Sequence, residues 1–267
     1  MSMKIGFIGA GNMGSAIMKG IAGSSLASET ELYAFDPFEE KLRSLEAFGV
    51  KALKSAFDVA KECKYVFLAI KPQQFGDALP GIRDAVADDT VIVSIAAGIT
   101  TEYIRSETIP NAKVVLVMPN TPLLLGAGAT ALSKSDSVSD DEFAVVRQIF
   151  DSCGKTAVIS PDKMKEIIAI NGSSPAFIYL FAKGFTEYAK SQEIDENTAL
   201  SLFAQTLIGS AKMLTDSGMT IDELIKMVSS PGGTTLAGLD ALYEGRLTDI
   251  VGDACDRCTK RAYELSK

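Results

Sequence analysis

A glycine-rich hexapeptide near the N-terminus has the spacing that binds phosphates. Gly9-Ala10-Gly11-Asn12-Met13-Gly14 follows the apolar run 4–8 and precedes a segment of helical character. In a G-x-G-x-x-G fingerprint the first glycine permits a tight turn, the second lets the backbone approach a pyrophosphate, and the third lets the helix pack on the sheet. The helix then offers its positive end to the pyrophosphate. We therefore expect a dinucleotide to be bound by Gly9, Gly11, Asn12, Met13 and Gly14. A glycine turn without a ligand is the simpler alternative.

An acidic residue follows the second strand-like run, which is the position of the acid in this type of dinucleotide-binding motif. Asp36 ends a second strand-like run, downstream of the glycines. A carboxylate there accepts hydrogen bonds from the adenosine ribose and repels a 2′-phosphate. No Arg or Lys follows before Lys41, so charge favours NADH, although NADPH is not excluded. The alternative role of Asp36 is to cap a helix that begins at Pro37.

Three further segments follow strand-like runs, where a doubly wound sheet binds its ligands. They are Ala69-Ile70-Lys71-Pro72-Gln73, Ala96-Ala97-Gly98-Ile99 and Met118-Pro119-Asn120-Thr121-Pro122. From them we expect cofactor contacts at Ala69, Lys71, Pro72, Ala97 and Asn120. Lys71 is equally well explained as a solvated lysine at a strand end, and Asn120 as a turn residue.

The absence of histidine limits the chemistry that the chain can perform. With no His among its 267 residues, the chain has no Ser–His or Cys–His nucleophile and no His-based metal site. Acid–base work must come from Lys, Tyr, Asp, Glu, a hydroxyl or water. We therefore expect a cofactor to carry the difficult step, and we expect no metal.

These residues need a parallel sheet to position them. The first 160 residues alternate short apolar runs with helical segments, which is typical of an α/β fold of the Rossmann type, a doubly wound sheet. The expected strands are 4–8, 31–35, 65–70, 91–95, 114–118 and 129–132, and Ser139 with Glu142 has capping-box spacing. Residues 161–267 contain only helical patterns. Several of these helices are apolar on more than one face and need burial on several sides, so we expect 161–267 to be an all-α dimerisation domain. The strands and the glycine motif make 1–160 the expected dinucleotide-binding domain.

The composition is that of a globular protein, with 47% hydrophobic and 22% charged residues. The net charge of −8 makes nucleic acid and membrane surfaces unlikely partners. No apolar stretch reaches membrane-spanning length, and no signal peptide is recognisable. Four cysteines suggest no disulfide framework in a chain this long. We interpret Cys255-x-x-Cys258 as two cysteines on one helix, with neither a metal site nor a redox site. We expect a cytoplasmic protein.

A segment far along the chain, residues 230–235, indicates a second ligand-binding site. Ser230-Pro231-Gly232-Gly233-Thr234-Thr235 lets the backbone pass close to a small ligand, and amides at the following helix start can hold a carboxylate. A turn with an N-cap threonine is the alternative. Together with Lys71-Pro72-Gln73 and Asn171-Gly172-Ser173-Ser174-Pro175-Ala176-Phe177, this segment resembles the pyrroline-5-carboxylate reductase family. The resemblance extends over essentially the whole chain. It departs from the usual pattern at Ile168-Ala169-Ile170, where a D-A-V-T-type run is commoner.

The resemblance implies an enzyme of the last step of proline biosynthesis, which reduces the cyclic imine 1-pyrroline-5-carboxylate to L-proline with NAD(P)H. It implies that Thr235 hydrogen-bonds the ring nitrogen, and we assign this hydroxyl orientation and proton relay. The substrate would be bound by Ser230, Gly232, Gly233, Thr234 and Thr235, with Lys71 beside the nicotinamide as a second catalytic candidate. The active site would combine the cofactor domain of one subunit with the helical domain of its partner. We therefore expect at least a dimer, with a decamer as the larger alternative.

Two other functions fit part of the sequence. A β-hydroxyacid dehydrogenase also begins with a strand and G-x-G-x-M-G, but it carries a catalytic lysine at the start of its helical domain, where this chain has no lysine until Lys183. A non-catalytic sensor of NAD(P)H would bind the cofactor without needing the Gly232–Thr235 loop. Turnover of a cyclic imine would separate the sensor from the reductase.

Overall fold

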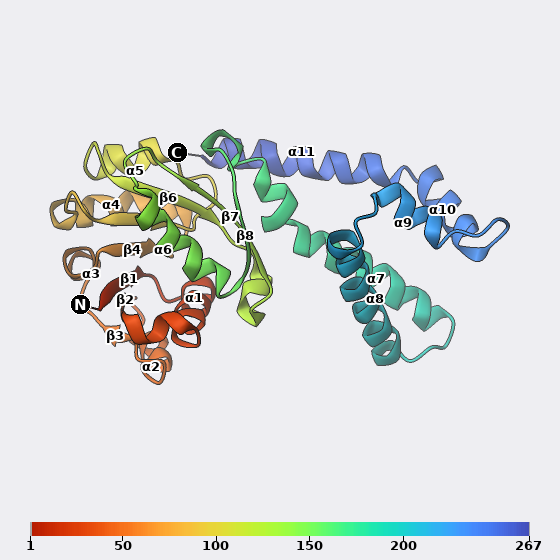
Figure 1. Ribbon diagram of the computed structural model, residues 1–267, viewed down its shortest axis with the longest axis horizontal. Coiled ribbons are helices and arrows are strands. Elements are labelled where there is room, and N and C mark those ends of the chain that lie inside the picture. The colour runs from red at the N-terminus through yellow and green to blue at the C-terminus, as the bar shows by residue number, and fades with distance from the viewer. Residues whose placement is uncertain (1, 267) are drawn as a thin grey trace. The chain divides into compact units, whose positions relative to one another are not determined.

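The computed structural model describes residues 2–266 of the chain. Eight strands form a single sheet in the order β3-β2-β1-β4-β5-β6-β7-β8 (Figure 1). All neighbours pair in parallel except β7, which runs antiparallel to β6. The strands are β1 (Met3–Ile8), β2 (Thr30–Phe35), β3 (Lys51–Ala52), β4 (Tyr65–Leu68), β5 (Val91–Ser94), β6 (Lys113–Met118), β7 (Gly128–Lys134) and β8 (Gly154–Val158).

Helices cover both faces of this sheet, which explains the continuous apolar runs of its central strands. All four residues of β4 and of β5 are buried. Side chains of α1 (Asn12–Ala22), α2 (Glu39–Glu46) and α6 (Asp140–Asp151) join one core cluster. Those of α3 (Ala56–Glu62), α4 (Phe75–Ile82) and α5 (Thr101–Glu107) join the other. A strand buried on both faces has no reason to alternate apolar with polar residues.

The strand order reverses between β1 and β4. From β1 the sheet continues to β2 on one side and to β4 on the other. Loops that leave the carboxyl ends of two such strands diverge to opposite faces, and ligands of open α/β sheets bind in the crevice that results. The turn at Gly9 leaves β1 at this point.

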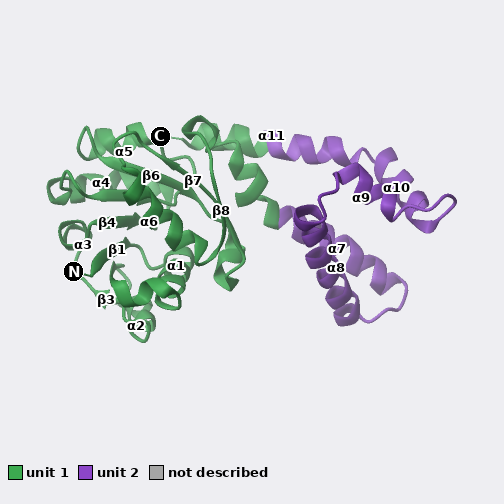
Figure 2. Ribbon diagram, viewed as in Figure 1, with its two compact units in different colours: residues 1–175, 257–267 green, residues 176–256 purple. Residues whose placement is uncertain are grey.

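The remaining helices are α7 (Ser174–Ser191), α8 (Glu196–Asp216), α9 (Ile221–Met227), α10 (Thr234–Glu244) and α11 (Leu247–Leu265). Residues 176–256 form a second compact unit (Figure 2), hereafter unit 2, while residues 1–175 and 257–267 form unit 1. Within unit 2, Phe185 of α7 stacks on Phe203 of α8 with ring centroids 4.2 Å apart.

The fold class expected from the sequence, a doubly wound sheet followed by an all-α part, is confirmed. The compact units divide the chain at Pro175, whereas we expected a domain boundary at residue 160. The segment 161–175 stays with the sheet because Met164 is buried in its core and Asn171 hydrogen-bonds to strand backbone. Among residues 2–266, no helix combines the length and the apolar character needed to cross a membrane.

Candidate active site

The glycine turn after β1 is shaped by close contacts with its surroundings. Gly9 has φ +103°, and its N–H donates to the carbonyl of Phe35 at 2.8 Å. A Cβ on Gly9 would collide with the carbonyl oxygen of Ala69, the residue after β4. A Cβ on Gly14 would lie 2.6 Å from the carbonyl oxygen of Gly9. Glycine at these two positions is therefore required by the turn and by the packing of α1 on the sheet.

Gly11 differs from its neighbours. It is the N-cap residue of α1, has φ −72°, and an added Cβ would meet no atom within 4 Å. No side chain caps this helix, and no acidic residue lies in its first turn. The first N–H groups of α1 are therefore left for an anion, because they have no intrahelical partner. These features fit the pyrophosphate of a dinucleotide.

Asp36 follows β2 and anchors the same turn. It is buried, and its Oδ2 accepts from the N–H of Ala10 at 2.8 Å while Oδ1 accepts from the N–H of Phe38 at 3.0 Å. Lys41 donates to both oxygens, at 3.1 and 3.3 Å. Burial alone would raise the pKa of Asp36, but these donors outweigh burial and lower it. The carboxylate is therefore charged, and it bonds Phe38, the N-cap residue of α2.

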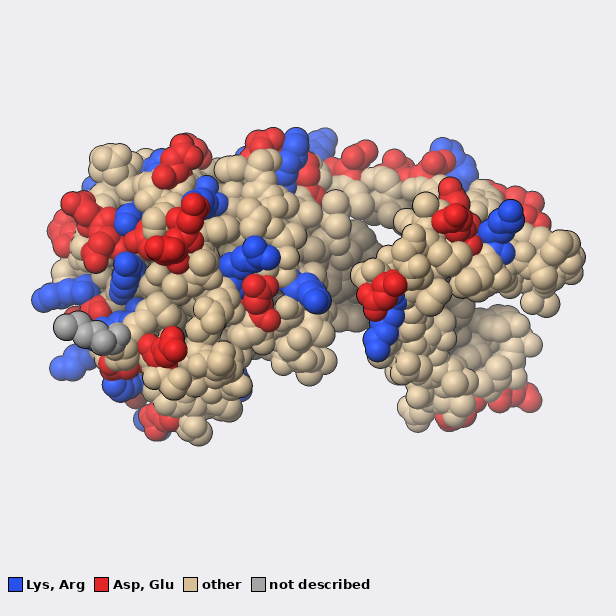
Figure 3. All heavy atoms as spheres, viewed as in Figure 1, with Lys and Arg blue, Asp and Glu red and all other residues tan. Residues whose placement is uncertain are grey.

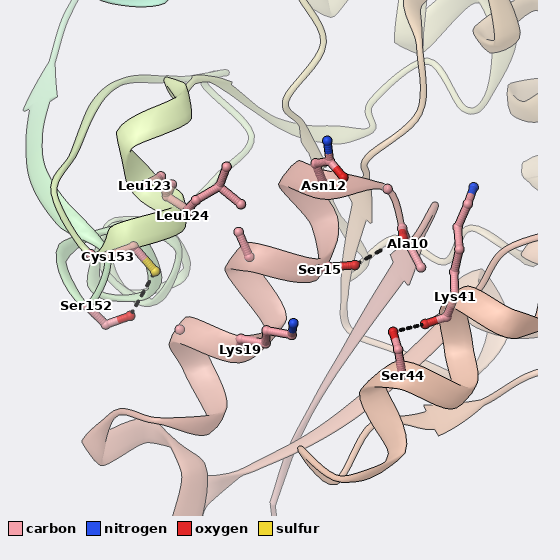
Figure 4. A pocket seen from close by; sticks show the side chains of 14 residues that line it. Ala10, Asn12, Ser15, Lys19, Lys41, Ser44, Leu123, Leu124, Ser152 and Cys153 are labelled. Atoms are coloured by element: carbon pink, nitrogen blue, oxygen red, sulfur yellow. Dashed lines mark hydrogen bonds between the residues drawn. The ribbon is translucent and has the colours of Figure 1, made fainter. Parts of the chain in front are cut away.

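A groove of about 560 Å³ runs beside α1 and begins at the glycine turn (Figure 4). Ala10, Gly11 and Asn12 line the groove at the glycine turn, and Lys41 and Ser44 of α2 also line it. Lys19 of α1 also lines the groove, and its amine lies 5.1 Å from the ring centroid of Phe48. The rest of the lining is formed by residues after β6 and α6, namely Leu123, Leu124, Gly126, Ser152 and Cys153.

The other expected contacts also lie at carboxyl ends of strands. Ala69, Lys71 and Pro72 follow β4, and the side chain of Lys71 is exposed. Ala97 is exposed after β5, beside the buried Gly98. An added Cβ on Gly98 would lie 3.4 Å from the carbonyl oxygen of Ala262, so the last turns of α11 support the Ala97–Gly98 turn.

Two asparagine side chains join the ends of β6 and β7. Pro119 has no N–H to continue the ladder past Met118. The side-chain oxygen of Asn120 accepts from the N–H of Ala129 at 2.9 Å. The amide of Asn171 donates to the carbonyls of Met118 and Ala129, at 2.7 and 2.9 Å. The oxygen of Asn120 is thus engaged within the chain, and we had assigned no role to Asn171.

In unit 2, residues 230–233 make a tight turn that leads directly into Thr234 and Thr235, the first residues of α10. The N–H of Gly233 donates to the carbonyl of Ser230 at 2.9 Å, and Gly232 has φ +70°. Proline at the second position and a left-handed glycine at the third are typical of a type II turn. Gly233 is the N-cap of α10 and brings no side chain to its first N–H groups, while Thr234 and Thr235 are exposed. The turn therefore offers amides and hydroxyls to a small anionic ligand.

The cysteines and acidic residues do not form a metal site in the part of the chain that the structure describes. Across residues 2–266, no group of three or more His, Cys, Asp or Glu side chains could hold a metal ion. Cys63 and Cys153 are buried free thiols, and burial raises the pKa of Cys63 to about 12. Cys255 and Cys258 lie one turn apart within α11.

Comparisons with known proteins decide the family. Residues 161–265 match the family model described as pyrroline-5-carboxylate reductase dimerisation, and residues 4–98 match the one described as NADP oxidoreductase coenzyme F420-dependent. Pyrroline-5-carboxylate reductase of Escherichia coli K12 is 34% identical, and the alignment covers 100% of both chains. The chain belongs to the pyrroline-5-carboxylate reductase family.

Solved structures of this family agree with that assignment. A pyrroline-5-carboxylate reductase from Coxiella burnetii superposes with a TM-score of 0.91 at 30% identity, over 100% of both chains. The pyrroline carboxylate reductase of Plasmodium falciparum, solved with NADP bound, gives a TM-score of 0.89 at 26% identity, over 99% of this chain and 98% of that one. The resemblance noted in the sequence is therefore confirmed, and membership excludes the β-hydroxyacid dehydrogenase alternative.

Proposed function

We propose that this protein reduces 1-pyrroline-5-carboxylate to L-proline with NAD(P)H. The observation that carries the proposal is the relationship to pyrroline-5-carboxylate reductases over the full length of the chain. It includes both the glycine turn after β1 and the Ser230–Thr235 turn of unit 2. A sensor of NAD(P)H would need the first of these features but not the second.

The cofactor is assigned to the carboxyl edge of the sheet. The pyrophosphate would be held by the amides of the Gly9–Gly14 turn, because α1 begins without a side-chain cap. Asp36 would face the adenosine ribose, where a carboxylate favours NADH, and its ion pair with Lys41 offsets part of that charge. The nicotinamide end would be contacted by Ala69, Lys71, Pro72 and Ala97. Asn120 would contribute through its side-chain NH2 group, because its oxygen accepts from Ala129. When bound, the cofactor supplies a hydride to the imine carbon.

The substrate is assigned to the Ser230–Thr235 turn. The substrate carboxylate would accept from the amides of Gly232, Gly233 and Thr234, next to the positive end of α10. The hydroxyl of Thr235 makes no hydrogen bond within residues 2–266, so it is available to a ligand. A hydroxyl is too weak an acid to protonate the ring nitrogen by itself, so Thr235 would orient this nitrogen and relay a proton from water. Ser230 would complete the polar lining, and Lys71 is a second candidate for stabilising charge.

Self-association is part of the proposed site. A family model described as a dimerisation domain matches residues 161–265. We propose at least a dimer, in which the Ser230–Thr235 turn serves the cofactor domain of a second copy.

The test of the proposal is the loss of NADH or NADPH absorbance on mixing with 1-pyrroline-5-carboxylate. We expect oxidation with both cofactors and a faster rate with NADH. In Thr235→Ala, kcat should fall by at least about 100-fold, while Thr235→Ser should recover much of it. Thr206→Ala is the matched control, because that hydroxyl bonds the carbonyl of Leu202 within α8.

Three outcomes would count against parts of the proposal. A Thr235→Ala variant with normal turnover would remove the catalytic role of that hydroxyl. A faster rate with NADPH would overturn the charge argument at Asp36 but keep the reductase. No oxidation with either cofactor, in folded protein that binds them, would favour a sensor or another imine substrate.

A further inference from the structure

The carboxylate of Asp36 has its hydrogen-bonding capacity filled by the chain itself. Each of its oxygens accepts one backbone N–H, from Phe38 or Ala10, and each also accepts from Lys41. An ionised carboxylate has about four acceptor positions. A ribose hydroxyl can therefore donate a hydrogen bond to Asp36 only if one of these donors moves away.

Lys41 is the donor that can leave. The N–H groups of Ala10 and Phe38 are fixed by the glycine turn and by the start of α2. The Lys41 side chain is 39% exposed, and Asp36 is its only ion-pair partner among residues 2–266. Its amine also lies 4.5 Å from the ring centroid of Phe38, which is itself 55% exposed. Rotation about side-chain bonds is enough to free one acceptor position on each oxygen.

The lysine also changes the charge that a nucleotide meets at this point. An isolated carboxylate repels a 2′-phosphate, but Asp36 and Lys41 together carry no net charge. Lys41 lies on the wall of the groove beside α1, which Lys19, Ser15 and Ser44 also line (Figure 4). Asp36, which bonds the lining residues Ala10 and Lys41, is thus already paired with a cation. A phosphate placed there would find an ammonium group able to turn towards it.

We propose that Lys41 makes the adenosine end of the site tolerant of both cofactors. With NADH, Lys41 gives up part of its contact with Asp36 to the ribose hydroxyls. With NADPH, its ammonium group turns from Asp36 to the 2′-phosphate, and the two backbone N–H groups keep the carboxylate in place. The inference rests on the proposed use of NAD(P)H but not on the identity of the imine.

The test compares two nucleotides that lack the nicotinamide, 5′-ADP and 2′,5′-ADP, by isothermal titration calorimetry on the full chain. The wild type should bind both. In Lys41→Met, affinity for 2′,5′-ADP should fall by at least about tenfold, as expected for the loss of a charge-assisted hydrogen bond. Affinity for 5′-ADP should stay within about twofold or improve, because Asp36 gains free acceptor positions.

Arg43→Met is the matched control. It removes the same charge from the same helix, but Arg43 pairs with Glu39 on an exposed surface and does not line the groove. We expect this variant to bind both nucleotides as the wild type does. If both variants bind 2′,5′-ADP equally weakly, the effect comes from the net charge of α2 and not from the position of Lys41. If Lys41→Met binds 2′,5′-ADP as tightly as the wild type does, the proposal is wrong. Neither result depends on turnover of 1-pyrroline-5-carboxylate, so failure of the proposed function would appear separately.

Discussion

At the scale of single residues, the glycines of the turn after β1 have different physical reasons to be glycine. Gly9 adopts φ +103°, and the chain leaves no room for a Cβ on Gly9 or Gly14. Gly11 has an ordinary φ and open space around the position of a Cβ. Packing within the chain therefore explains the first two but not Gly11. A ligand that approaches the backbone at Gly11 would explain it.

This difference predicts that Gly11→Ala separates binding from stability. The methyl group would occupy the space assigned to the pyrophosphate, so the Kd for NADH should rise by at least about tenfold. The free energy of unfolding should change by less than about 0.5 kcal/mol, because no contact is lost and no strain is added. The Kd can be measured by fluorescence of bound NADH, and stability by urea unfolding of the unliganded protein.

Gly14→Ala provides the comparison. Its Cβ would lie 2.6 Å from the carbonyl oxygen of Gly9 and 3.0 Å from the Cβ of Ala69, so the backbone must shift. We expect a loss of about 1–3 kcal/mol of stability together with weaker binding. If Gly11→Ala proves as destabilising as Gly14→Ala, or binds NADH normally, Gly11 has no special relation to the ligand.

The sequence predicted which residues stand at the site better than it predicted their partners. The spacing of the glycines and Asp36 indicated the turn and the acid that follows β2, and both lie together in the structure. It could not show that Lys41 reaches back to Asp36, because a helical turn had first to place it there. Asn171 was missed for a similar reason, since its partners are backbone carbonyls about forty and fifty residues away.

At the scale of elements, the start of α6 combines a helix cap with a buried ion pair. Ser139 and Glu142 bond each other's backbone N–H groups, which is the capping box expected from their spacing. Glu142 is 7% exposed and also accepts from Lys113 of β6 at 2.7 Å. Burial would raise the pKa of Glu142, but Lys113 and Ser139 outweigh burial and lower it to about 2. The charged form of Glu142 is therefore favoured in the folded protein.

This arrangement predicts a contribution to stability that acid removes. Because the pKa is lower in the folded than in the unfolded chain, the contribution is complete above pH 4.5 and is lost as the pH falls towards 2. A shift of this size corresponds to roughly 3 kcal/mol at most. Glu142→Gln should therefore be less stable than the wild type at pH 7, and the difference should shrink between about pH 5 and pH 2. Urea unfolding across this range measures it.

Glu46→Gln is a suitable control for this experiment. Glu46 is the last residue of α2, is exposed, and has no ion-pair partner among residues 2–266. We expect its stability to follow that of the wild type at every pH. A constant difference between Glu142→Gln and the wild type, from pH 7 to pH 2, would mean that the charge of Glu142 is not what stabilises the start of α6.

The elements that the sequence predicted are those with a buried apolar run. All six expected strands are present as β1, β2, β4, β5, β6 and β7. Both missed strands lack that signal. β3 has two residues, and the side chains of β8, Gly-Lys-Thr-Ala-Val, are largely exposed at the edge of the sheet. Their positions depend on pairing with a neighbour rather than on the residues that they contain.

At the scale of the whole molecule, unit 2 lacks a core of its own. Of its residues 176–256, Ala189 alone is buried, while Leu180, Leu202 and Tyr188 are each more than 60% exposed. On the face shown in Figure 3, charged side chains of unit 2 stand in small groups between wide uncharged areas. So much exposed apolar surface is typical of an interface between subunits. This agrees with the match of residues 161–265 to a dimerisation family.

The exposed leucines of unit 2 should therefore hold subunits together. Leu180 is 70% exposed on α7, and a carboxylate in its place would have to lose its water in an apolar interface. We expect Leu180→Glu to raise the dissociation constant of the oligomer by at least about 100-fold, as measured by sedimentation velocity over a dilution series. Leu125→Glu is the control, because Leu125 is 88% exposed in unit 1. A monomeric wild type, or equal dissociation of both variants, would show that subunits do not associate through α7. If Leu180→Glu dissociates and loses turnover while still binding NADH, reduction needs the assembled oligomer, as a site shared between two copies requires.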